Sequence, residues 1–124
     1  MARIAIVGVG GLGTQALSSL LAEQFYTLSL FEYDTVEIHN LHRQTLYNEN
    51  HIGRKKIEVL SEVIMNSYGK EVCSLIKFFN VKIDTDNIAQ SLFNCDIVID
   101  ATDTVQTKLM LHDGCHRLKK IFIH

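Results

Sequence analysis

The chain has 124 residues, of which 47% are hydrophobic and 21% are charged, and its formal net charge is −2. This length corresponds to one ordinary domain with one core, so we expect no second, substrate-binding domain within it. The charge gives no basic field, which excludes nucleic acid and an anionic membrane surface as expected partners, and no apolar run approaches the ~18 residues of a membrane span.

The first half of the chain alternates strand patterns with helical patterns. Residues 3–7 (RIAIV) form a β-branched run, which predicts a buried strand. Apolar residues recur at helical spacing over residues 11–24, and residues 28–31 predict a second strand. The polar stretch of residues 33–53 is long for a loop in a compact domain, so we expect it to be functional or partly helical. Helical spacing returns over residues 55–67.

The second half repeats this alternation. Residues 72–81 form a third extended run, and Asp86 is the predicted N-cap of a short helix. Residues 96–101 (DIVIDA) predict a buried strand, residues 105–118 a last helix, and residues 121–123 a fifth strand. Since strands alternate with helices, we expect one α/β, Rossmann-like domain over the whole chain, with a mostly parallel sheet and helices on both faces.

Glycines follow the first predicted strand directly. The segment Gly8-Val9-Gly10-Gly11-Leu12-Gly13 fits G-x-G-x-x-G between a strand and a helix. In such a loop Gly8 makes the tight turn, Gly10 lets a phosphate approach the backbone, and Gly13 lets helix and strand pack closely. The helix N-terminus adds free N–H groups and a partial positive charge. The loop predicts a nucleotide-phosphate site, and the alternative is a glycine turn that serves packing alone.

Glu32 ends the second predicted strand, where an acidic side chain accepts hydrogen bonds from ribose hydroxyls. A solvent-facing strand end is the alternative interpretation. With the glycine loop and Glu32 alone, NAD and ATP are equally good ligands. An NAD(P)-binding oxidoreductase domain and a non-catalytic nucleotide-binding module therefore stay open beside an ATP-dependent enzyme.

Further motifs distinguish ATP from NAD. In chain order they are Gly8 to Gly13, Glu32 with Asp34 and Val36, Asn40 to Gln44, Gly53 with Lys56, and Thr102 with Asp103. Together they resemble the ThiF/MoeB/HesA family, relatives of the adenylating half of ubiquitin-activating enzymes. Members of that family typically carry G-x-G-G-L-G, D-x-D-x-V, N-L-x-R-Q, G-x-x-K and T-D-N in this order. The resemblance covers essentially the whole chain.

The resemblance implies an adenylyltransferase with ATP and Mg²⁺ as cofactors. The implied partner is a ubiquitin-like sulfur-carrier protein ending in Gly-Gly, of the kind used in thiamine or molybdopterin biosynthesis. Its C-terminal carboxylate attacks the α-phosphate of ATP and gives an acyl-adenylate and pyrophosphate. A C-terminal carboxylate has a pKa near ~3.5, so it is ionised at neutral pH and needs no general base. Catalysis is then expected to depend on positioning and charge neutralisation. Relatives pair, so a homodimer is implied as well.

The resemblance also assigns roles to residues. Arg43 and Lys56 are the implied phosphate ligands and catalytic cations, with Lys55 competing for the role of Lys56. Asn40 is an implied clamp on the nucleotide, and Asp103 is an implied catalytic carboxylate on the Mg²⁺ side. Each residue also has a non-functional interpretation. Arg43 could be a surface arginine and Lys56 part of a solvated first helical turn. Asn40 could be a turn residue, and Asp103 could be a helix N-cap. The expected nucleotide-binding set is Gly8, Gly10, Gly11, Gly13, Glu32, Asp34, Asn40, Arg43, Lys56, Asp103 and Thr104.

The chain departs from the family pattern at several points. Glu32 stands where the family has an aspartate, and Thr104 stands where it has an asparagine but could still cap the helix. The family's N-terminal extension and its later sheet are missing, so we expect a domain truncated after the fifth strand, either a fragment or a short homologue. Three widely spaced cysteines without a C-x-x-C pair, and no signal peptide, favour a cytoplasmic protein with reduced thiols.

Overall fold

A computed structural model describes residues 2–9, 11–23, 26–38, 41 and 47–124, and for residues 11–14 it describes the backbone alone. The predicted ligand residues Gly10, Asn40 and Arg43 therefore lie outside the described residues.

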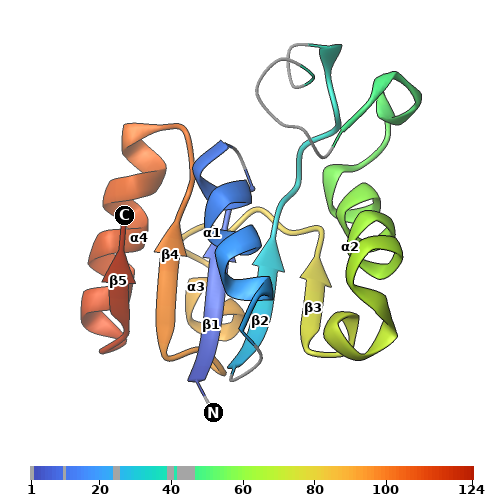
Figure 1. The fold of residues 1–124 in the computed structure, drawn as a ribbon. Helices are drawn as coiled ribbons and strands as arrows, with labels where there is room; N and C mark the ends of the chain where they lie inside the picture. Colours follow the sequence, from blue (N-terminus) through green and yellow to red (C-terminus); the bar gives the residue numbers. More distant parts are fainter. Residues whose placement is uncertain (1, 10, 24–25, 39–40, 42–46) are drawn as a thin grey trace.

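Five strands form one parallel sheet in the order β3-β2-β1-β4-β5 (Figure 1). The strands are β1 (Ala2–Val7), β2 (Tyr26–Phe31), β3 (Ile76–Phe79), β4 (Ile97–Asp100) and β5 (Ile121–Ile123). The helices are α1 (Gly11–Leu21), α2 (Lys56–Cys73), α3 (Ile88–Ser91) and α4 (Val105–Arg117), with a short 3₁₀ helix, η2 (Glu49–His51). The predicted Rossmann-like α/β fold is confirmed.

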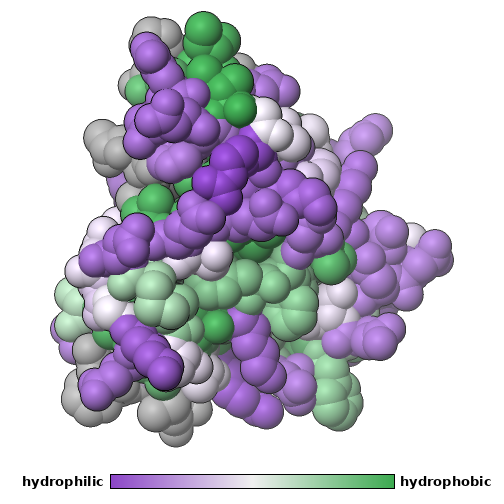
Figure 2. All heavy atoms as spheres, turned by 90° about the vertical axis from the view of Figure 1, so that its right-hand side faces the viewer, coloured by the Kyte–Doolittle hydropathy of each residue, from purple (hydrophilic) through white to green (hydrophobic). Residues whose placement is uncertain are grey.

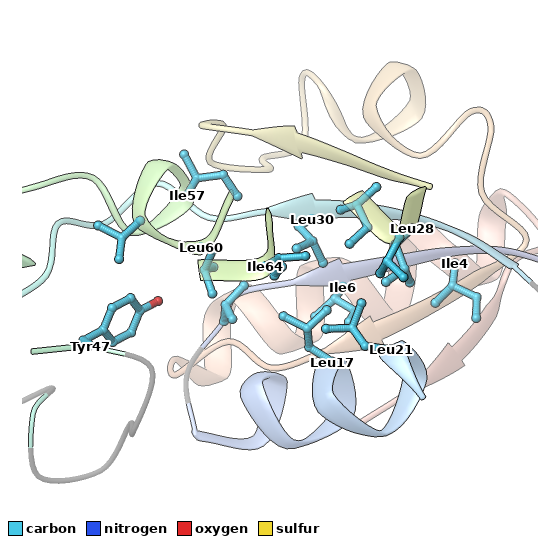
Figure 3. Close-up of a cluster of buried hydrophobic side chains, with 14 of the residues drawn as sticks. Ile4, Ile6, Leu17, Leu21, Leu28, Leu30, Tyr47, Ile57, Leu60 and Ile64 are labelled. Carbon is cyan, nitrogen blue, oxygen red and sulfur yellow. The ribbon is translucent and has the colours of Figure 1, made fainter. Parts of the chain in front are cut away.

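Successive residues along the strands belong alternately to two separate apolar clusters, one on each face of the sheet. Ile4 and Ile6 of β1 pack in the cluster that also holds Tyr47 and buried apolar side chains of α1 and α2 (Figure 3). Ala5 and Val7 belong to the cluster that holds those of α3 and α4. Because side chains alternate between the two faces of a strand, this division requires helices on both sides of the sheet, as predicted.

The boundary between α2 and β3 differs from the prediction. The helix continues to Cys73, and the strand begins at Ile76, so residues 72–75 are not extended. Gly69 has non-helical dihedral angles (φ 89°, ψ 176°) inside the helix. This kink interrupts the 3.6-residue periodicity of the apolar residues. The apolar residues after the kink therefore resemble the start of a strand, but Val72 still belongs to α2 and packs in the core.

The N-cap of α3 was also predicted wrongly. Asn87, not Asp86, precedes the first helical residue. Asp84 supplies the turn instead, because its Oδ1 accepts hydrogen bonds from the backbone N–H groups of Asp86 and Asn87, both at 2.9 Å. An acidic side chain that bonds the backbone two or three residues later produces such a turn without capping a helix.

The outer edge of the sheet carries a shallow groove between α2 and β3. Met65, Cys73, Ile76 and Phe78 contribute its apolar lining, which crosses the middle of a mostly hydrophilic face (Figure 2). The groove shares no residue with the cleft described below. In the described part of the chain, no helix is both long enough and apolar enough to cross a membrane.

Candidate functional site

A cleft opens at the carboxyl ends of the strands, where the strand order reverses. The chain builds β1, β2 and β3 outward and then returns to place β4 on the other side of β1. Open α/β sheets bind ligands in the crevice at such a switch point. The structure brings six of the predicted site residues together in the lining of this cleft: Gly8, Glu32, Asp34, Lys56, Asp103 and Thr104.

Gly8 makes the turn at the end of β1, as predicted, and its φ is +82°. The backbone here also packs tightly against the end of β4. A Cβ added at Gly8 would lie 2.9 Å from the carbonyl oxygen of Ala101. The N–H of Gly8 donates to the carbonyl of Phe31, and the N–H of Ala101 donates to that of Val7, both at 2.8 Å. Glycine is therefore required for the close approach of two strand ends as well as for the turn.

Glu32 and Lys56 form a buried ion pair in the lining of the cleft. Glu32 is 6% exposed and Lys56 is 7% exposed, and the Nζ of Lys56 lies 3.6 Å from the Oε1 of Glu32. Burial raises the pKa of Glu32, and the charge of Lys56 and a hydrogen bond from the backbone of Val9 oppose this. The alternative interpretations, a solvent-facing strand end for Glu32 and a solvated helical turn for Lys56, are both wrong.

Backbone pairing decides which of the two adjacent lysines enters the cleft. Thr35 and Lys55 form an isolated antiparallel bridge, and the N–H of Lys56 donates to the carbonyl of Asp34 at 3.0 Å. Lys55 is thereby held as the exposed N-cap residue of α2, and Lys56 becomes its first, buried residue. Lys56, not Lys55, is therefore the lysine that lines the cleft.

The segment after β4 places an exposed carboxylate at the opposite wall. Asp103 is exposed and lines the cleft. Thr104 is the N-cap of α4, and its Oγ1 accepts a hydrogen bond from the N–H of Thr107 at 3.2 Å. The capping interpretation of Asp103 is wrong, and the expectation that Thr104 could cap the helix is confirmed.

Two features at or next to the cleft have no counterpart among the predictions from sequence. Asp100, the last residue of β4, is completely buried. An acidic residue that ends an apolar run is the signal that could have identified it. On the outer rim, the Nζ of Lys82 lies 5.5 Å from the centre of the Tyr33 ring, a cation–π contact between two lining residues. That contact joins segments distant in sequence, so no local pattern marks it.

The remaining predicted residues are only partly described. Gly11 begins α1 and Gly13 lies within it, which places the start of a helix directly after the glycine loop. The start of a helix offers free N–H groups and the positive end of the helix dipole to an anion. For the two residues from the N-L-x-R-Q motif, Asn40 and Arg43, the roles stay predictions.

Two side chains of the cleft could hold a nucleoside triphosphate together with a hard cation. Lys56 supplies a positive charge in a poorly hydrated place, where electrostatic interactions are stronger than in water. Asp103 offers carboxylate oxygens, and Mg²⁺ typically uses one or two carboxylates together with phosphate oxygens. Within the described residues no group of three His, Cys, Asp or Glu side chains could hold a metal by itself. Asp103 lines the cleft and is exposed, so its carboxylate could serve as one ligand of such an ion.

Comparison with known proteins identifies relatives along the entire chain. The model of the ThiF family matches residues 1–124. The adenylyltransferase and sulfurtransferase MOCS3 of Aedes aegypti is 38% identical over 119 residues, which cover 94% of this chain and 26% of that protein. The molybdopterin-synthase adenylyltransferase of Salmonella typhimurium is 30% identical over 118 residues, which cover 95% of this chain and 46% of that protein.

A solved structure shows the same arrangement. The tRNA N6-threonylcarbamoyladenosine dehydratase TcdA of E. coli, in complex with ATP, matches with a TM-score of 0.83 and 29% identity. The match covers 98% of this chain and 49% of that one. The chain thus spans between about a quarter and a half of the length of these relatives.

Replacing Gly8 with alanine should destabilise the fold. The left-handed backbone and the contact with the Ala101 carbonyl together should lower the free energy of unfolding by roughly 2–4 kcal/mol. Gly53→Ala is the matched control, because Gly53 has φ +86° but no atom within 4 Å of an added Cβ. Urea denaturation followed by circular dichroism measures both. Equal losses in the two variants would show that the contact with Ala101 does not matter.

Breaking the buried ion pair should cost more than breaking an exposed one. Lys56→Met leaves the Glu32 carboxylate buried without its partner and should lower the free energy of unfolding by about 3–5 kcal/mol. The double variant Glu32→Gln/Lys56→Met should recover most of this loss. Arg54→Met, which breaks the exposed pair with Glu62, should cost about 0–1 kcal/mol.

The penalty of Lys56→Met should also depend on pH. Burial raises the pKa of Glu32 and the charge of Lys56 lowers it, so Lys56→Met should raise this pKa further. A carboxyl group with a raised pKa takes up a proton more readily in the folded state, so the variant should regain stability as pH falls through that raised pKa. The difference between Lys56→Met and the wild type should therefore be smaller at about pH 5 than at about pH 7. A penalty that matches that of Arg54→Met at both pH values contradicts the buried pair.

Proposed function

Because the chain belongs to the ThiF family, we propose that it forms the ATP-binding part of an adenylyltransferase. The proposed substrate is the C-terminal carboxylate of a ubiquitin-like sulfur-carrier protein ending in Gly-Gly, which becomes an acyl-adenylate with release of pyrophosphate. The observation that carries the proposal is the buried Lys56–Glu32 pair at the switch point of the sheet. The names of the relatives, adenylyltransferases of the MOCS3 and molybdopterin-synthase types, support it.

The chemistry requires one anion to approach another. A carboxylate oxygen forms a bond to the α-phosphorus, and the bond to the leaving pyrophosphate breaks. The attacking group is already ionised at neutral pH, so no general base is needed. The protein instead has to neutralise phosphate charge and hold the reactants in line. Lys56 supplies a fixed positive charge for this purpose, and Arg43 is proposed as a second.

The other roles follow from position in the cleft. Glu32, released from Lys56, accepts hydrogen bonds from the ribose hydroxyls, with Asp34 beside it on the same rim. Asp103 and Thr104 face the phosphates from the opposite wall, and Asp103 would hold Mg²⁺, which supplies further neutralisation of the phosphate charge when bound. Asn40 is proposed to clamp the nucleotide. Gly8, Gly10, Gly11 and Gly13 provide the phosphate loop.

The setting of the whole protein belongs to the same proposal. A homodimer is proposed from the resemblance to the family. A cytoplasmic location is proposed because the cysteines are free, and of these Cys95 and Cys115 are buried. The NAD(P)-dependent oxidoreductase alternative gives no role to Lys56 or Asp103. It also has no support from the names of the MOCS3 and molybdopterin-synthase relatives, which are adenylyltransferases.

A second candidate differs in substrate. The likeness to the tRNA-modifying TcdA, at a TM-score of 0.83, favours activation of a carboxylate carried on tRNA. The net charge of −2 disfavours it, because binding to nucleic acid normally requires a basic surface. Both candidates place the same demands on the nucleotide site and differ in the molecule that carries the carboxylate.

ATP–pyrophosphate exchange tests the proposal and separates the two candidates. We expect Mg·ATP to bind more tightly than NAD, and exchange to require a carrier with a free Gly-Gly carboxylate. A carrier amidated at its C-terminus should give no exchange. Lys56→Met should reduce exchange by about 100-fold or more, the scale of a lost electrostatic stabiliser, whereas Arg54→Met should not. Exchange that requires tRNA would favour the second candidate, and its absence with either substrate in folded protein would contradict both.

A further inference from the structure

Asp100 is the only charged residue of β4, and it is completely buried at the strand's carboxyl end. A buried carboxylate is costly unless hydrogen bonds and an opposite charge compensate it. Its Oδ1 accepts two hydrogen bonds from Thr102, one from the backbone N–H at 2.9 Å and one from the hydroxyl at 2.6 Å. Its Oδ2 accepts a hydrogen bond from the Nζ of Lys108 at 3.2 Å.

These bonds fix the turn that leads to Asp103. Two donors of Thr102 converge on one oxygen, which restrains both the backbone and the side chain of that residue. On the other side of the turn, the carbonyl of Ala101 lies against Gly8, so the turn is held by the end of β1 as well. Asp103 is the next residue after Thr102, and it faces the cleft.

The start of α4 holds the segment around Asp103 from its C-terminal side. Thr104 caps the helix through its hydrogen bond with Thr107. One residue later, Lys108 reaches back to the Oδ2 of Asp100. Asp103 therefore lies between two segments that are both held by Asp100. Thr102 precedes it and donates to the Oδ1 of Asp100, and the capped helix α4 follows it and contributes Lys108, which donates to the Oδ2.

We propose that Asp100 is a positioning residue, which acts through Thr102 to hold Asp103 where a Mg²⁺ ion on the nucleotide phosphates would meet it. This inference rests on the proposed function. Lys108 compensates the charge of Asp100, and the hydrogen bonds to Thr102 set the geometry. Residues that orient the ligands of a metal typically change metal affinity by 10–100-fold when they are mutated.

Two substitutions at Asp100 separate geometry from charge. Asp100→Ala removes both acceptors, whereas Asp100→Asn retains one oxygen that can accept the bonds from Thr102. The readout is the gain in ATP affinity produced by Mg²⁺, measured by titration calorimetry with Mg²⁺ and with EDTA. We expect this gain to be smaller than in the wild type by a factor of about ten or more in Asp100→Ala. In Asp100→Asn the gain should stay within about threefold of the wild-type value. A merely structural role would lower the melting temperature without changing the gain.

Thr102→Val and Asp113→Asn complete the set of variants. Thr102→Val loses only the hydroxyl bond, and should lose about 3–10-fold of the gain even if Asp100→Ala fails to fold. Asp113→Asn is the control, because Asp113 forms an exposed pair with Arg117 on α4, and it should change nothing. Amide hydrogen exchange at Thr102 should be faster in Asp100→Ala than in the wild type.

The outcomes distinguish this inference from the function on which it rests. An unchanged Mg²⁺ gain in Thr102→Val and in folded Asp100→Ala overturns the inference alone. An equal loss in Asp100→Asn and Asp100→Ala also overturns it, because charge rather than geometry would then be responsible. Wild-type protein that binds no Mg·ATP overturns the proposed function and the inference together.

Discussion

The contact between Lys56 and Glu32 constrains the rest of the cleft. Both side chains are more than nine-tenths buried, and burying charge is unfavourable unless the charges remain paired. The pair joins the end of β2 to the start of α2, so it ties the backbone on either side of residues 33–55 to the sheet. A phosphate can replace the carboxylate as the partner of Lys56, and ribose hydroxyls can replace the lysine as the partner of Glu32. The charges held together in the free protein are those that the proposed nucleotide would separate.

The opposite wall follows from a second constraint, the close approach of β1 and β4. Gly8 lets the two strand ends meet, and the turn after β4 then has little freedom. Asp100 secures the same turn from inside the protein by accepting both hydrogen bonds of Thr102. One wall therefore carries the buried Lys56–Glu32 pair and the other an exposed carboxylate, Asp103. A polyanion accompanied by a cation could use the lysine of the first wall and the carboxylate of the second.

Much of the fold could be predicted from the sequence because its signals are local. Strands with helices on both faces contain continuous apolar runs, as in residues 4–7 and 97–99, and the glycine loop shows the required turn at Gly8. The errors arise where one residue alters the local pattern, as Gly69 does within α2. The family motif favoured Lys56 over Lys55, but no local pattern explains that choice, because the distant bridge between Thr35 and Lys55 sets it. The burial of Asp100 and its hydrogen bonds could not be predicted for a related reason. A buried carboxylate is recognised by the donors around it, and these are known only from the folded structure. Arg43 and Asn40 stay predictions from the family motif.

A structure of the protein with Mg²⁺ and a non-hydrolysable ATP analogue would show directly whether the nucleotide separates Lys56 from Glu32. We expect the Nζ of Lys56, now 3.6 Å from the Oε1 of Glu32, to move to within hydrogen-bond distance of a phosphate oxygen. Glu32 should then accept a hydrogen bond from a ribose hydroxyl. A nucleotide bound in the cleft with the Lys56–Glu32 contact unchanged, or bound elsewhere on the sheet, would contradict this expectation.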